Sequence, residues 1–120
     1  MRVLIADDEC DIAEAVAEFV KSCGHEAMTV TSGGLDVLPA YDRFQPHLVI
    51  LDIMMPRFNG ITISHALMSR RPRPKVVLFS GKLDSQHPFV ASSGATRFLP
   101  KPVPMAEIKK LLDEFGSGAT

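Results

Sequence analysis

The chain has 120 residues, of which 46% are hydrophobic, a length that is enough for one domain with one core but too short for two. Lys and Arg number 13 against 14 Asp and Glu, so the net charge of -1 gives no strong field to draw the protein onto nucleic acid or an anionic membrane. We therefore expect no direct binding to nucleic acid and no membrane association.

Short apolar runs alternate with helical patterns along the chain. Each run is rich in Val, Ile and Leu or is bounded by polar residues, which is typical of buried parallel strands. The predicted strands are, in chain order, residues 2–6, 26–30, 48–51, 76–79 and 97–99, of which the second and the fifth are the weaker.

The first helical pattern is the clearest. Its apolar residues recur at intervals of three and four, and Gly24 follows where a left-handed C-terminal cap is expected. A helix is therefore predicted over the stretch that contains Ile12, Val16, Phe19, Val20 and Cys23.

Four further helices are predicted between or after the strands. Residues 62–70 follow an Asn-Gly turn, and Pro104 is typical of the first turn of a last helix. Helices at 35–44 and 83–93 are expected to be short or distorted, because each contains a proline.

Strict alternation of strands and helices with short connections predicts parallel strands in an open, doubly wound α/β sheet with helices on both faces. We expect one domain over residues 1–116 and a flexible tail at 117–120. The apolar run that begins the chain is too short for a signal peptide or a membrane span, so a cytoplasmic location is expected.

Polar side chains follow each strong strand where it ends. Asp7 and Asp8 come after the first strand, Asp52 ends the third, Ser80 follows the fourth, and Lys101 lies just beyond the fifth. Ligands bind at this edge of an open α/β sheet, so these residues are expected to form one site.

Three carboxylates in one site repel one another unless a cation balances them. Oxygen ligands without His or Cys favour a hard ion such as Mg²⁺, with Asp8 and Asp52 as direct ligands. Such an ion allows a carboxylate to act as nucleophile toward a phosphoryl group, with Lys101 and Ser80 contacting the phosphoryl oxygens.

With these motifs the sequence resembles the receiver domains of bacterial response regulators over nearly its whole length. The motifs are ADDE at 6–9, LVILDIMMP at 48–56, the turn at 59–60, LFSG at 78–81, GA at 94–95 and FLPKP at 98–102. The resemblance implies a flavodoxin-like fold with five parallel strands in the order 2-1-3-4-5.

The resemblance also implies roles in phosphoryl transfer. Asp52 is the expected phosphoryl acceptor, and Mg²⁺ or Mn²⁺ is bound directly by Asp8, mostly through water by Asp7, and by the backbone carbonyl of Met54. Lys101 is expected to bind the phosphoryl group and to precede a cis peptide bond to Pro102.

A phosphorylation-dependent switch is the function that the resemblance implies. The donor is expected to be a histidine kinase or a histidine phosphotransfer protein, and the domain to catalyse only transfer onto its own Asp52 and the hydrolysis of that product. Ser80 and Phe98 form the expected switch pair, where many receivers have Tyr in place of Phe98. A downstream protein is expected to bind the face of the fourth helix, fifth strand and fifth helix.

Three other functions remain as alternatives. A docking module that acts without phosphorylation is suggested by the unusual segment 83–93, although the site residues are intact. An aspartate-nucleophile phosphatase would need two carboxylates separated by two positions after the first strand, whereas Asp7 and Asp8 are adjacent. A flavodoxin-type protein would need a phosphate-binding loop where this chain has the anionic ADDEC.

Two groups of polar residues receive no functional role. The basic segment at 70–75 is predicted to be a solvated connection at the sheet edge away from the acids. The four histidines, at 25, 47, 65 and 87, are predicted to be ordinary surface or turn residues, and the two cysteines to be reduced thiols.

Overall fold

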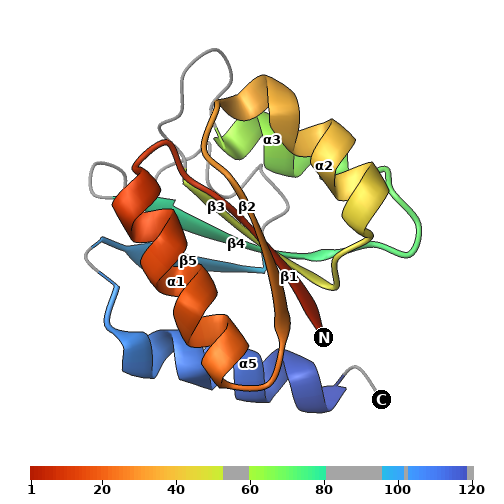
Figure 1. The fold of residues 1–120 in the computed structure, drawn as a ribbon. Coiled ribbons are helices and arrows are strands. Elements are labelled where there is room, and N and C mark those ends of the chain that lie inside the picture. Colours follow the sequence, from red (N-terminus) through yellow and green to blue (C-terminus); the bar gives the residue numbers. More distant parts are fainter. Residues whose placement is uncertain (53–59, 81–95, 102, 119–120) are drawn as a thin grey trace.

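A five-stranded parallel sheet forms the centre of the protein in the computed structural model, which describes residues 1–52, 60–80, 96–101 and 103–118 (Figure 1). The order is β2-β1-β3-β4-β5, which confirms the predicted topology. The strands are β1 (Arg2–Ala6), β2 (Glu26–Val30), β3 (Leu48–Asp52), β4 (Lys75–Ser80) and β5 (Arg97–Pro100).

Helices connect and cover these strands. They are α1 (Cys10–Ser22), α2 (Val37–Phe44), which a short 3-10 turn (Gly34–Asp36) precedes, α3 (Gly60–Leu67) and α5 (Met105–Gly118). The helix predicted at 83–93 lies outside the described residues. Helix α5 continues to Gly118, past residue 116 where we expected the domain to end. Among the described residues, no helix has the length and apolar character to cross a bilayer.

The sheet separates two hydrophobic clusters, because side chains of a strand alternate between its faces. Leu4, Val49 and Leu51 pack with α2 and α3 in one cluster. Val3 and Ile50 pack with α1 and α5 in the other. Figure 1 shows α1 and α5 on the opposite side of the sheet from α2 and α3.

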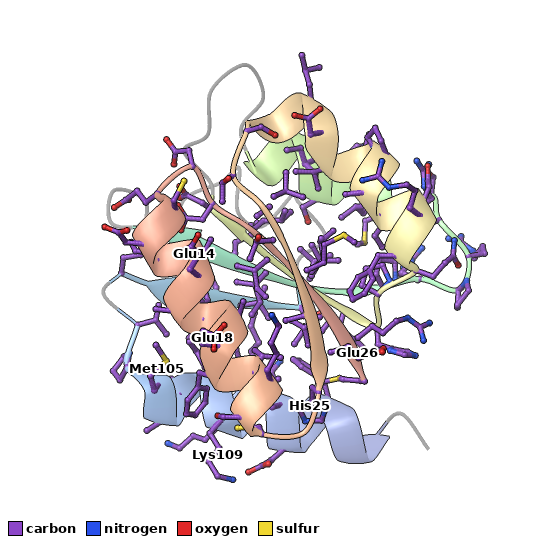
Figure 2. The ribbon with its side chains drawn as sticks, in the orientation of Figure 1. Glu14, Glu18, His25, Glu26, Met105 and Lys109 are labelled. Carbon is purple, nitrogen blue, oxygen red and sulfur yellow. The ribbon has the colours of Figure 1, made fainter. Side chains whose placement is uncertain are left out.

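The end of α1 confirms the predicted glycine cap. Gly24 has a φ of 89°, and its N–H donates to the carbonyl of Lys21, while the N–H of His25 donates to the carbonyl of Val20. These two bonds form a Schellman motif, which satisfies carbonyls that the helix itself leaves unpaired. The outer surface of α1 carries Glu14 and Glu18, both exposed (Figure 2).

The helix predicted at 35–44 is short, as expected: the 3-10 turn covers its first residues and α2 begins at Val37. Pro39 lies in the first turn of α2, where its missing N–H costs no intrahelical hydrogen bond. The helix ends at Phe44, and the next residue, Gln45, is left-handed with a φ of 53° and donates its N–H to the carbonyl of Tyr41. Short α2 therefore accommodates its proline without a break.

Candidate functional site

Two carboxylates lie side by side at the carboxyl ends of the central strands. Ala6 of β1 is the register partner of Leu51 of β3, so Asp7 and Asp52 follow at adjacent positions. Both belong by alternation to the sheet face that α1 and α5 cover, and both are buried, with 2% and 4% of their surface exposed. The backbone N–H of Asp7 donates to the carbonyl of Val30, which holds this end of β1 against β2.

The third predicted carboxylate joins the other two. One oxygen each of Asp7, Asp8 and Asp52 lies within 4.8 Å of the others, and Asp8 is exposed. Three oxygens at this spacing suit a hard divalent cation, which prefers carboxylates and water to nitrogen or sulfur ligands. The donor set therefore fits the Mg²⁺ or Mn²⁺ that the sequence led us to expect.

Lys101, which directly follows β5, brings a positive charge to the carboxylates. Its Nζ lies 2.8 Å from Oδ2 of Asp7 and 3.5 Å from Oδ2 of Asp52, and 14% of the side chain is exposed. Burial alone lowers the pKa of Lys101, but its hydrogen bond to Asp7 and the charges of Asp52, Asp7 and Glu9 outweigh burial and raise the pKa. Lys101 is therefore a cation at every physiological pH.

Glu9 belongs to this site, although the sequence analysis gave it no role. Its Oε1 lies 3.4 Å from Nζ of Lys101, and its backbone N–H donates to Oδ1 of Asp7 at 2.9 Å. The backbone of Glu9 thus fixes the Asp7 carboxylate, and the side chain of Glu9 forms an ion pair with Lys101. Its place in the ADDE motif was the available signal, but only the fold shows that Lys101 lies near.

The remaining predicted residues are described only in part. Ser80 ends β4 opposite Pro100, and its side chain is not described. Phe98 is half-buried and packs against the cluster under α2 and α3, which belongs to the other face of the sheet from Asp52. Met54 lies outside the described residues, and so does Pro102, whose predicted cis bond remains a prediction. A cis bond that the sequence analysis did not predict joins Arg71 and Pro72.

Known proteins resemble the sequence over most of its length. Residues 3–113 match the family model described as response regulator receiver domain. The chain is 32% identical over 107 residues to the transcriptional regulatory protein PdtaR of Mycobacterium tuberculosis, across 89% of this chain and 52% of that protein. It is 27% identical over 117 residues to the chemotaxis protein CheY of Listeria monocytogenes, across 95% of this chain and 97% of that protein. The chain thus spans about half the length of PdtaR.

Solved structures share the fold. The receiver domain of the Francisella response regulator 1452 matches with a TM-score of 0.88 at 21% identity, over 99% of this chain and 98% of that one. The BeF3-activated DrrB receiver domain matches with a TM-score of 0.85 at 24% identity, over 97% of both chains. The shared fold includes the strand order. At identities below 25%, these matches show a common fold and nothing further.

Proposed function

Because the chain belongs to the family of response regulator receiver domains, we propose that it is a switch controlled by phosphorylation of Asp52. The observation that carries this proposal is the surroundings of the Asp52 carboxylate. It is buried, it shares a cation-sized cluster with Asp7 and Asp8, and the ammonium of Lys101 lies 3.5 Å away. Carboxylates this close repel one another, so the cluster is costly unless positive charge from Lys101 and a bound cation balances it.

In the proposed transfer, a carboxylate oxygen of Asp52 forms a bond to phosphorus while the bond between phosphorus and an imidazole nitrogen of the donor breaks. The products are an aspartyl phosphate and a free histidine on the donor, a histidine kinase or a histidine phosphotransfer protein. Lys101 can turn its ammonium from Asp7 to the added phosphoryl oxygens, since both lie within reach of its flexible side chain. The domain thus catalyses only the transfer onto its own Asp52 and the hydrolysis of that product.

The cation site would be formed by Asp8 and Asp52 as direct ligands, Asp7 through water, and the backbone carbonyl of Met54. A bound Mg²⁺ or Mn²⁺ would offset the charge that develops on the phosphoryl oxygens. Glu9 is exposed and interacts with Lys101, so it competes with the phosphoryl group for that ammonium. The exposed Asp8 leaves one side of the cluster open to ions and water.

Signalling would proceed from the phosphoryl group through Ser80 and Phe98. Ser80 ends β4, the strand that pairs with β5, and in this proposal its hydroxyl moves toward the new charge and the half-buried Phe98 ring turns inward. The surface that changes is the predicted fourth helix with β5 and α5, which we propose as the site for a downstream protein. Phe98 has no hydroxyl, so its contribution to that surface is packing.

The proposal is tested by incubating the protein with acetyl phosphate and Mg²⁺ and recording its intact mass. We expect the gain of one phosphoryl group, no gain in EDTA, and no gain for Asp52→Asn. The matched control is Asp36→Asn, an exposed carboxylate elsewhere, which should be phosphorylated as the parent protein is. An Asp52→Asn variant that is still phosphorylated refutes the assignment. A parent protein that takes no phosphoryl group from any donor favours a docking role without phosphorylation.

A further inference from the structure

A cavity of about 530 Å³ opens at the amino-terminal edge of the sheet, the opposite edge to the carboxylates. Figure 1 shows this edge near the label N, where β1 begins, whereas the carboxylates follow the other end of that strand. The volume is in the range that binds small organic molecules. The lining of the cavity includes Arg2, Tyr41, His47, Arg73, Lys75 and Phe115.

Cations without a carboxylate partner line this cavity. Arg73 and Lys75 are exposed, and neither forms an ion pair within the described part of the chain. Arg2 uses its Nε to donate to the carbonyls of Phe44 and Gln45, each at 3.0 Å, which fixes its guanidinium beside the cavity. The acid in the lining is Glu114, whose charge Arg97 already balances. The cavity therefore favours an anion.

Neutral polar groups add directional donors. Tyr41 is 6% exposed, and its hydroxyl takes part in none of the hydrogen bonds described for the chain. Burial raises the pKa of this hydroxyl, against the effect of Arg70 and together with that of Asp42, so it keeps its proton and can donate. Because no buried side-chain nitrogen or oxygen of the described residues lacks a partner, this hydroxyl is reached by solvent, and it can donate to a ligand in the cavity that Tyr41 lines.

His47 provides a second donor, and hydrogen bonds with the backbone of Arg2 orient its ring. Its Nδ1 accepts the N–H of Arg2 at 3.0 Å, and its own N–H donates to the carbonyl of Arg2 at 2.9 Å. Burial, the charge of Arg2 and the amino terminus lower the pKa of His47, while Glu26 opposes them. The ring is therefore neutral at pH 7 with its proton on Nε2.

We propose that this cavity binds a ring-bearing organic anion of about the size of a mononucleotide. The rings of Tyr41 and Phe115, with three prolines, provide an apolar wall for the ligand's ring. Arg73 and Lys75 receive its anionic groups, and the neutral donors add hydrogen bonds. This site is separate from the phosphorylation site, and its occupation does not depend on Asp52.

The proposal is tested by titrating the isotope-labelled protein in EDTA with ADP, with pyrophosphate and with adenosine, and following the backbone amide signals by NMR. ADP should cause saturable shifts at Tyr41, His47 and Lys75 and none at Asp7 or Asp52. Its Kd should be at least about tenfold lower than that of either fragment, because ring and charge contribute together. Pyrophosphate that binds as well as ADP would exclude a ring-bearing ligand.

Two charge-reversal variants provide the matched comparison. Arg73→Glu should raise the Kd for ADP by about tenfold or more, whereas Arg71→Glu, an exposed arginine of the same segment outside the cavity lining, should change it by less than about threefold. Tyr41→Phe keeps the buried ring and should weaken ADP binding about threefold to tenfold. Equal effects of Arg71→Glu and Arg73→Glu, or no saturable shift up to about 10 mM ADP, would overturn the proposal.

Discussion

The two edges of the sheet hold opposite charges and balance them in different ways. At the carboxyl edge, Asp7 and Asp52 are buried and already lie within ion-pair distance of Lys101. At the amino edge, Arg73 and Lys75 lie in solvent beside a cavity and pair with no described carboxylate. A ligand at the carboxyl edge must rearrange existing ion pairs. An anion at the amino edge would instead give Arg73 and Lys75 a partner that they lack among the described carboxylates. Under the two proposals, the same strands would carry a phosphorylation site at one end and an anion-binding site at the other.

The largest expected effect is that of Lys101→Met at the carboxyl edge. The substitution leaves buried carboxylates without their cation, so the free energy of unfolding in EDTA should fall by about 3 kcal/mol. Mg²⁺ at millimolar concentration should restore most of this loss, because the ion replaces the missing charge. Urea denaturation with and without Mg²⁺ measures both quantities.

Lys109→Met is the control for that variant. Lys109 pairs with Asp113 on the exposed surface of α5, so its removal should cause no measurable change with or without Mg²⁺ (Figure 2). A loss in Lys101→Met that Mg²⁺ does not restore would show that packing of the lysine stem, and not charge balance, stabilises the carboxyl edge.

An intermediate effect is expected for Arg2→Met at the amino edge. The variant loses the hydrogen bonds to the last carbonyls of α2, so the free energy of unfolding should fall by about 1 kcal/mol. Because these acceptors are uncharged, Mg²⁺ should not restore the loss. Arg43→Met, an exposed arginine on α2, is the control and should leave stability unchanged. Recovery of Arg2→Met by Mg²⁺ would contradict the separation of the two edges.

The smallest expected effect is a gain in stability for Asp8→Asn. Removal of this exposed carboxylate relieves repulsion from Asp7 and Asp52, and we expect an increase of roughly 0.5 kcal/mol in EDTA. The additional stability that Mg²⁺ gives the parent protein should largely disappear, because a ligand is lost. Glu18→Gln on the outer surface of α1 should keep the full response to Mg²⁺, and a full response in Asp8→Asn would remove Asp8 from the cation site.

The sequence predicted the carboxyl edge better than the amino edge, for physical reasons. Buried parallel strands have recognisable apolar runs, and the residue after each run must lie at the same edge of the sheet, so Asp7, Asp8, Asp52 and Lys101 could be grouped before the fold was known. The role of Glu9 was not predicted, because its place in the ADDE motif does not show what its side chain contacts and its partner Lys101 is far away in the sequence.

The cavity at the amino edge was missed because its walls come from separate segments. Tyr41 lies within α2, His47 precedes β3, and Phe115 belongs to α5, so no spacing connects them. The basic segment at 70–75 was recognised but interpreted as a solvated connection. Charge clusters are visible in a sequence, whereas a hollow between them depends on how helices and loops pack.

The alternation of side chains along β1 and β3 limits how this protein can change in length. Asp7 and Asp52 share a face only because each continues the two-residue repeat of its strand. Deletion of one residue within either strand would turn one carboxylate to the opposite layer and move apolar groups with it. Insertions and deletions between natural relatives should therefore occur in connecting segments such as 31–33, while the two central strands keep their length.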